Sequence, residues 1–160
     1  MDAFPGQTVI DPMLLIPAVV TGWIGVATLI ACLAGWPPLA GRFRTIQPAT
    51  GQAFRFASGA IGASRHFPVN CNNCLFLAVG PAGLRISLLF IFRVLSPALL
   101  IPWSAIETVD EERRWLVRYT VIHIRGFEIR VRVRGKPGAR IAGAWRRYAA
   151  CGGHPTRSGA

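Results

Sequence analysis

The sequence predicts an α+β, mainly β, protein: an N-terminal transmembrane helix, then a partly open antiparallel barrel of about seven strands, capped by a C-terminal helix. Two patterns support this. No charged residue occurs between Asp11 and Arg42, and apolar residues beyond residue 53 recur mostly at every second position. With 52% hydrophobic and 16% charged residues and a net charge of +11, the chain is too apolar for an ordinary soluble domain or for a disordered protein.

The predicted transmembrane helix covers residues 13–36. Its core, Met13–Leu33, contains only Thr21 and Thr28 as polar residues. At a rise of about 1.5 Å per residue, this core extends about 31 Å, which matches a hydrocarbon layer of about 30 Å. The Gly-Trp-Pro-Pro sequence of residues 35–38 is expected to end the helix.

A signal peptide and a buried core helix are the two other interpretations of the N-terminal segment. A signal peptide needs a basic start and a shorter apolar core, whereas residues 1–12 contain Asp2 and Asp11 and no Lys or Arg. A helix buried in a soluble core would not need so many apolar residues without a polar face. We therefore expect a membrane span.

The orientation of the span is predicted from its flanks. Residues 1–12 contain no basic residue, whereas Arg42, Arg44 and Arg55 follow the helix. The positive-inside rule then places residues 1–12 outside as a short extracytoplasmic tail and the rest of the chain in the cytoplasm, beneath a bacterial inner membrane.

A β-rich domain is expected over residues 53–151, after a juxtamembrane connector at 37–52 and before a disordered tail at 152–160. Residues Arg125-Gly126 suit a tight hairpin turn, and Ile141, Trp145 and Tyr148 recur at the spacing of one helix face. The expected strands are Ala53–Ile61, Leu75–Val79, Leu84–Leu95, Ala98–Ile101, one beginning at Ile106, Tyr119–Ile124 and Phe127–Arg134.

Residues 86–106 could alternatively form a second membrane span. Arg93 would lie near its centre, at a cost of about 2.5–3.5 kcal/mol on insertion scales. Pro97 and Pro102 would also interrupt the helix. Strands are the favoured interpretation, and the second span remains an open alternative.

Residues 83–93 (GLRISLLFIFR) and 96–106 (SPALLIPWSAI), with Asn72-Asn73-Cys74 before them, carry a family resemblance. This stretch resembles a family of small, uncharacterised bacterial single-pass membrane proteins with a PH-like or GRAM-like domain. The chain departs from that pattern at Ala98, where a second Pro is expected, and at Ala105, where an acid is expected. The resemblance covers about residues 70–106, implies a PH-like half-barrel, and implies no catalytic residues.

The cysteines are the first candidates for chemistry. Cys71-x-x-Cys74 and Cys151-x-x-His154 could together supply four tetrahedral zinc ligands, with His66 as a further candidate. A single Cys-x-x-Cys is weak evidence, and a thioredoxin-like motif would need a βαβ context that is not predicted. We therefore expect no metal and no cofactor. A small zinc-binding or thiol-redox membrane protein using Cys71 and Cys74 is the alternative function.

The acidic residues and histidines do not indicate an enzyme. Glu107, Asp110, Glu111 and Glu112 are expected to form a solvated strand end with ion pairs to the neighbouring arginines, and His123 is expected to be structural. The sequence lacks a P-loop, a G-x-G-x-x-G, an H-E-x-x-H and a nucleophile motif. A non-enzymatic protein is predicted.

The basic residues suggest a binding surface. Arg130, Arg132 and Arg134 share one face of the last strand, with Arg125 near them at the turn. Residues 37–160 contain 18 basic and 5 acidic residues, a net charge of +13. Beneath an anionic bilayer each basic residue contributes about 1 kcal/mol of attraction. The predicted partners are the bilayer itself and either anionic lipid head groups or an acidic protein. The alternative is a solvated basic face, and nucleic acid is not expected because no recognition motif is present.

Overall fold

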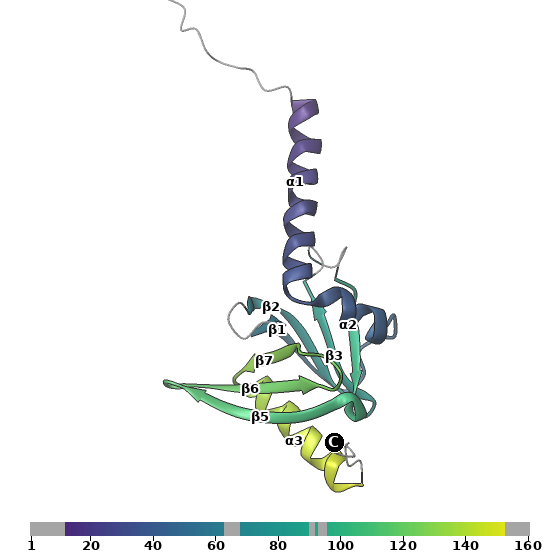
Figure 1. Ribbon diagram of the computed structural model, residues 1–160, viewed down its shortest axis with the longest axis vertical. Coiled ribbons are helices and arrows are strands. Elements are labelled where there is room, and N and C mark those ends of the chain that lie inside the picture. Colours follow the sequence, from purple (N-terminus) through teal and green to yellow (C-terminus); the bar gives the residue numbers. More distant parts are fainter. Residues whose placement is uncertain (1–11, 63–67, 90–91, 93–95, 153–160) are drawn as a thin grey trace, which may run out of the picture.

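The computed structural model describes residues 12–62, 68–89, 92 and 96–152. A long N-terminal helix projects from one end of a curled sheet, a short helix lies at the junction, and the C-terminal helix packs at the far end (Figure 1). The predicted tails, residues 1–12 and 152–160, fall almost entirely outside the described residues.

Helix α1 (Pro12–Leu33) confirms the predicted N-terminal helix. Its segment Met13–Leu33 is long and apolar enough to cross a membrane. The helix leaves most of its apolar side chains uncovered by protein, from Met13 at 82% exposed to Leu33 at 60%, whereas Ala31 is buried. The Thr28 hydroxyl donates to the carbonyl of Ile24 at 2.7 Å, so this polar group is satisfied within the helix. Such a surface suits contact with lipid, where backbone and hydroxyl groups must bond internally.

A second helix, α2 (Trp36–Phe43), lies in the first part of the connector expected at residues 37–52, and the sequence pattern did not predict it. Gly35 adopts a left-handed conformation with φ 72° and turns the chain sharply after α1. Pro37 is tolerated in the first turn of α2, because an N–H at this position would have no hydrogen-bond acceptor within the helix. The sequence Gly-Trp-Pro-Pro therefore ends one helix and begins the next, with Trp36, Leu39 and Phe43 buried.

Seven antiparallel strands form one curled sheet in the order β4-β3-β2-β1-β7-β6-β5. This half-barrel with its C-terminal helix confirms the predicted architecture. A short 3-10 helix, η2 (Trp103–Ala105), joins the two edge strands of the sheet. The strands are β1 (Gln52–Gly62), β2 (Val69–Val79), β3 (Gly83–Leu88), β4 (Leu99–Pro102), β5 (Ile106–Arg114), β6 (Val117–Ile124) and β7 (Arg130–Arg134).

Strand β2 is longer than the expected Leu75–Val79, because it begins at Val69. Its pairing with β1 is irregular between Phe54 and Gly59, and Phe56 and Asn73 adopt positive φ values of 57° and 54°. A bulge of this kind breaks the two-residue alternation, so the first half of β2 did not show the period of a strand.

Strand β3 is shorter than the expected Leu84–Leu95, because it ends at Leu88. The chain then leaves the sheet, and the Leu89 N–H donates to the carbonyl of Cys74 at 2.9 Å. The ring of Phe92 lies 5.6 Å from the ring of Trp23 on α1. The expected strand therefore extended too far, because neither Leu89 nor Phe92 belongs to β3, and residues 90, 91 and 93–95 of it lie outside the described part of the chain.

The alternative second span across residues 86–106 is not formed. Residues 86–88 belong to β3 and residues 99–102 to β4, and these two strands pair with each other. Arg93 lies outside the described residues. The strand interpretation was therefore correct at both ends of this stretch.

The core lies inside the curl of the sheet. Helix α3 (Lys136–Ala150) closes the distal end, and its Ile141 is fully buried against the sheet. At the opposite end, Trp36 and Leu39 of α2 are each only 1% exposed. One continuous buried cluster joins the end of α1, α2, the sheet and α3. The domain therefore has a single core that reaches the end of α1.

Close packing of α3 on the sheet produces the first prediction. A Cβ on Gly138 would lie 2.4 Å from the Thr120 hydroxyl oxygen and 2.9 Å from the Val133 carbonyl oxygen, whereas a Cβ on Gly143 would meet only a flexible Arg147 atom at 3.9 Å. Gly138→Ala should lower the free energy of unfolding by about 1–3 kcal/mol through overpacking. Gly143→Ala, the matched control, should raise it by up to about 1 kcal/mol through helix propensity.

Denaturant titration of the full chain in detergent, followed by circular dichroism, measures both changes. Equal stability effects for the two alanine variants would contradict the described packing of α3.

Candidate anion-binding site

The predicted alternation on the last strand is present, although β7 begins at Arg130 and not at Phe127. Val131 and Val133 are buried, whereas Arg130 and Arg132 are half-buried and Arg134 is exposed. The outer face of β7 therefore presents three arginines. Among the described residues, the Arg132 Nε is a buried side-chain nitrogen without a hydrogen-bond partner.

Acidic residues share this outer face. Asp110 on β5 stands opposite Val121 on β6, which stands opposite Arg132. Glu112 lies in the next such row, opposite Tyr119 and then Arg134. Two strand spacings of about 4.8 Å separate each acid from its arginine, a distance close to the Debye length at 0.1 M salt. The positive potential of the β7 face is consequently reduced by its own sheet.

Arg125 lies in the turn between β6 and β7, two residues after His123, which pairs with Arg130. Together with Arg42 and Arg44, from the end of α2, it lines a concave surface that encloses a volume of about 810 Å³. We call this surface the arginine hollow. Its remaining lining residues are Phe43, Thr45, Gln47, Leu100, Pro102, Ser104, Ala105 and Gly126.

The arginine hollow has the composition of an anion-binding site. All three guanidinium groups are exposed, and no carboxylate lines the surface. Within the described part of the chain, none of the three forms an ion pair. The guanidinium carbon of Arg42 lies 5.8 Å from the centre of the Phe43 ring, a cation–π distance. Guanidinium groups with hydroxyl and amide side chains beside them match the geometry of phosphate oxygens.

Three separate segments form the arginine hollow. Arg42 lies in the last turn of α2 and Arg44 directly follows the helix, residues 100–105 belong to β4 and η2, and Arg125 lies in the β6–β7 turn. The Thr45 N–H donates to the Ala98 carbonyl at 2.9 Å, and Arg44 forms a β-bridge with Leu99, so the chain after α2 is fixed on the edge of the sheet. Sequence reasoning used Arg42 and Arg44 only for orientation. No local pattern connects them with Arg125, because the connection is tertiary.

Comparison of the chain with protein-family models, curated proteins and solved structures finds no match. A candidate binding site must therefore be identified from the side chains of the protein itself. Among its basic surfaces, the arginine hollow combines concavity, exposed guanidinium groups and an absence of lining acids.

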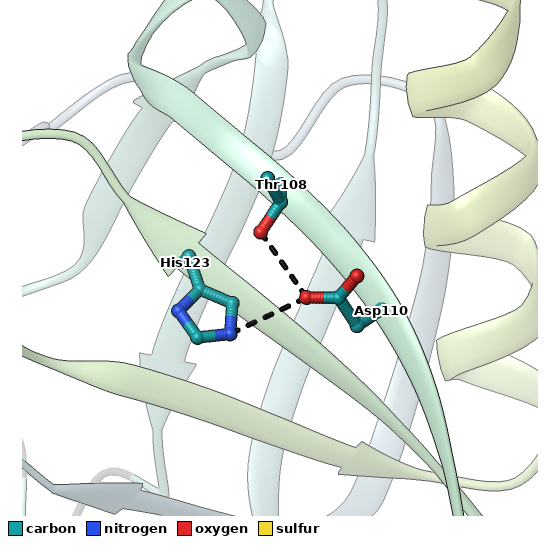
Figure 2. A network of polar contacts seen from close by, with 3 residues as sticks. All are labelled: Thr108, Asp110 and His123. Atoms are coloured by element: carbon teal, nitrogen blue, oxygen red, sulfur yellow. Dashed lines mark hydrogen bonds and ion pairs between the residues drawn. The ribbon is translucent and has the colours of Figure 1, made fainter.

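Two of the four clustered acids are engaged in contacts. Asp110 Oδ2 accepts a hydrogen bond from the Thr108 hydroxyl at 3.2 Å and lies 3.5 Å from His123 Nε2 (Figure 2). Glu111 pairs with Arg146 of α3 at 2.6 Å, instead of with the neighbouring arginines as expected. Asp110 and Glu111 are more than half exposed, so their contacts add little stability. They connect β5 with β6 and with α3.

Cys71 and Cys74 lie together on β2, where the side chains form a hydrogen bond. Burial, with a smaller contribution from Cys74, raises the pKa of the Cys71 thiol to about 12. Cys71 lines a small cavity beside α1, whereas Cys151 lines a cavity with Val79 at the other end of β2. Among the described residues no three His, Cys, Asp or Glu side chains come together. His66 and His154 lie outside this part of the chain, and the zinc or thiol-redox alternative stays a prediction.

The raised pKa of Cys71 produces a prediction about thiol reactivity. At pH 8 a thiol with a pKa of about 12 is about one part in ten thousand thiolate, and only the thiolate is nucleophilic. Iodoacetamide should therefore alkylate the exposed Cys151 at least about a hundred times faster than Cys71, as measured by peptide mass spectrometry. Denatured protein serves as the control, in which both should react alike. Rapid alkylation of folded Cys71 would contradict its burial and favour a redox role.

Proposed function

We propose that this protein is a non-enzymatic, single-pass inner-membrane protein whose PH-like domain binds the phosphate head groups of anionic lipids on the cytoplasmic side. Helix α1 supplies the anchor, and the arginine hollow supplies the binding site. The observation that supports the proposal best is the meeting of Arg42, Arg44 and Arg125 around one concave surface without a lining acid.

The position of the arginine hollow favours lipid as the ligand. α2 begins at Trp36, three residues after α1 ends at Leu33, and lies at the end of that helix (Figure 1). Arg42 is in the last turn of this eight-residue helix. With α1 across a bilayer, these guanidinium groups lie at the level where phosphate groups are found. A soluble acidic partner could also bind them, but only lipid is present at that level at high local concentration.

The magnitude of the attraction is sufficient for selectivity. Three arginines at about 1 kcal/mol each near an anionic surface contribute about 3 kcal/mol, which corresponds to about a hundredfold in affinity. The β7 arginines have the same number of charges but share their face with Asp110 and Glu112. The three arginines of β7 are therefore a matched control for the three arginines of the arginine hollow.

The proposed PH-like identity of the domain is supported by its architecture. Seven antiparallel strands curl around one core, and a C-terminal helix closes the distal end. The order of elements agrees with the resemblance found around residues 70–106. The strands and α3 serve as a rigid support, and the ligand site is built at the membrane end.

The lipid-binding site is tested with two triple variants of the full-length protein in detergent. One carries Arg42→Gln, Arg44→Gln and Arg125→Gln, and the control carries Gln at positions 130, 132 and 134. We expect the dissociation constant for dioctanoyl phosphatidylglycerol, measured by native mass spectrometry, to rise about a hundredfold in the first and less than about threefold in the second. Dioctanoyl phosphatidylcholine should bind weakly to all three proteins.

Equal losses in both triple variants would show a general charge effect and contradict the arginine hollow. A loss confined to the β7 variant would instead support the outer face of β7 as the binding surface. Circular dichroism of each variant confirms that the fold is retained.

The membrane orientation is tested with reporter fusions after residues 40 and 160. Because basic residues follow α1 and none precede it, a fluorescent reporter should be active and a periplasmic phosphatase inactive at both positions. Phosphatase activity at residue 160 would place the domain outside and would contradict binding to the cytoplasmic leaflet.

A further inference from the structure

A second concave surface lies on the outer face of β1, β2 and β3. Leu77 of β2 is buried in the core, so Phe76 and Ala78 on either side of it face outward, because successive side chains of a strand alternate. Across the ladder to β3, Phe76 pairs with Ser87 and Ala78 pairs with Arg85. These outward residues line a hollow of about 360 Å³, which we call the outer hollow.

The shape of the outer hollow follows from the sizes of its side chains. Ala53 on β1 pairs with Ala78 on β2, so two small side chains lie next to each other in its lining. Larger side chains surround them: Phe76 on the same strand, and Arg55 and Arg85 on the strands to either side. The sheet is therefore depressed at the two alanines.

The outer hollow suits a small molecule with an apolar body. The ring of Phe76, which lines it, lies 5.4 Å from the ring of Phe56, and Phe56 is 58% exposed, so apolar surface continues beside the hollow. Its volume falls in the range of about 300–1,000 Å³ that is typical of small-molecule sites. A protein partner would instead need about 800 Å² of surface on each side.

The charge of the outer hollow is positive. Arg55 and Arg85 line it, and no carboxylate does. Residues 12–106, which include β1 to β4, contain no Asp or Glu, and the acids of β5 lie three strands away from β1 in the sheet. The potential here is therefore less reduced by the sheet than at β7. Guanidinium groups bind carboxylates through short, charge-assisted hydrogen bonds.

We propose that the outer hollow binds a small organic acid. Its carboxylate lies between Arg55 and Arg85, with the Ser87 hydroxyl on the same face of β3, and its apolar body lies over Phe76 and the two alanines. The arginine hollow differs because it adds a third arginine and further polar side chains, as expected for phosphate. The inference does not depend on lipid binding by the arginine hollow or on the orientation of α1.

The test uses the full-length protein in phosphatidylcholine nanodiscs, with empty nanodiscs as the blank. Three fluorinated probes of similar size are titrated by fluorine NMR: trifluoromethylbenzoate, the neutral trifluoromethylbenzyl alcohol and the cationic trifluoromethylbenzylamine. We expect the benzoate to bind at least about tenfold more tightly than the alcohol, which is typical of one charge-assisted hydrogen bond, and the amine not to bind.

Two kinds of variant separate the charged part of the site from its apolar part. Arg55→Gln with Arg85→Gln should raise the dissociation constant of the benzoate at least about tenfold and leave that of the alcohol unchanged. Ala53→Leu should weaken both probes, because the larger side chain fills the hollow. Ala139→Leu, at an exposed position of α3, is the matched control and should weaken neither.

Several outcomes would overturn the proposal. These are absence of benzoate binding at its solubility limit, equal affinity for benzoate and alcohol, and unchanged affinity in the Ala53→Leu variant. A loss confined to the triple variant of Arg42, Arg44 and Arg125 would place the benzoate in the arginine hollow and would also overturn it. Unchanged phosphatidylglycerol binding by the outer-hollow variants, together with their circular dichroism, shows that the fold is retained and keeps this test separate from that of the lipid site.

Discussion

The indole of Trp36 joins the end of the N-terminal helix, α1, to the sheet. This side chain is 1% exposed, and its Nε1 donates to the Pro97 carbonyl at 3.0 Å. Burial of an aromatic ring of this size contributes several kcal/mol, and a bonded N–H removes the cost of burying its polar group. The direction of α2, the position of the arginine hollow and the course of the chain before β4 all depend on this junction.

The junction connects a helix whose surface is apolar with a domain whose apolar residues are enclosed in a core. Above it, α1 presents uncovered apolar side chains suited to hydrocarbon, and below it the sheet encloses a core closed by α3. The basic residues that form the arginine hollow lie at the transition between the two. The net charge of +13 on residues 37–160 is therefore not equally available for binding an anion. On β7, acids of the same face offset the arginines, whereas no acid lines the arginine hollow beside α2.

Sequence reasoning predicted the parts of the fold that depend on local periodicity. The 21 apolar residues of α1, the alternation of Val131 and Val133 with arginines, and the helical spacing of Ile141 and Trp145 are each explained by the element that contains them. Composition and spacing within one segment are sufficient to predict these elements, because the buried face of each follows its own helix or strand period.

The remaining features required tertiary information. The bulge at Asn73 disguised half of β2, and the Pro pair after Trp36 was interpreted only as a stop, although it also suits a helix start. The apolar composition after Leu88 continues that of the strand, so composition did not predict that β3 ends at Leu88. The arginine hollow combines residues from three distant segments, so only folding reveals that Arg125 belongs with Arg42.

The central claim is that the arginine hollow lies at the level of the lipid phosphates, whereas the far end of the domain does not. The most direct measurement is quenching of a fluorophore at Ser104→Cys, in the hollow, by lipids that carry a nitroxide on the head group. A fluorophore on Cys151, at the α3 end, is the reference. Strong quenching at Ser104 and little at Cys151 is predicted. Equal quenching at the two positions, or stronger quenching at Cys151, would contradict the proposed arrangement.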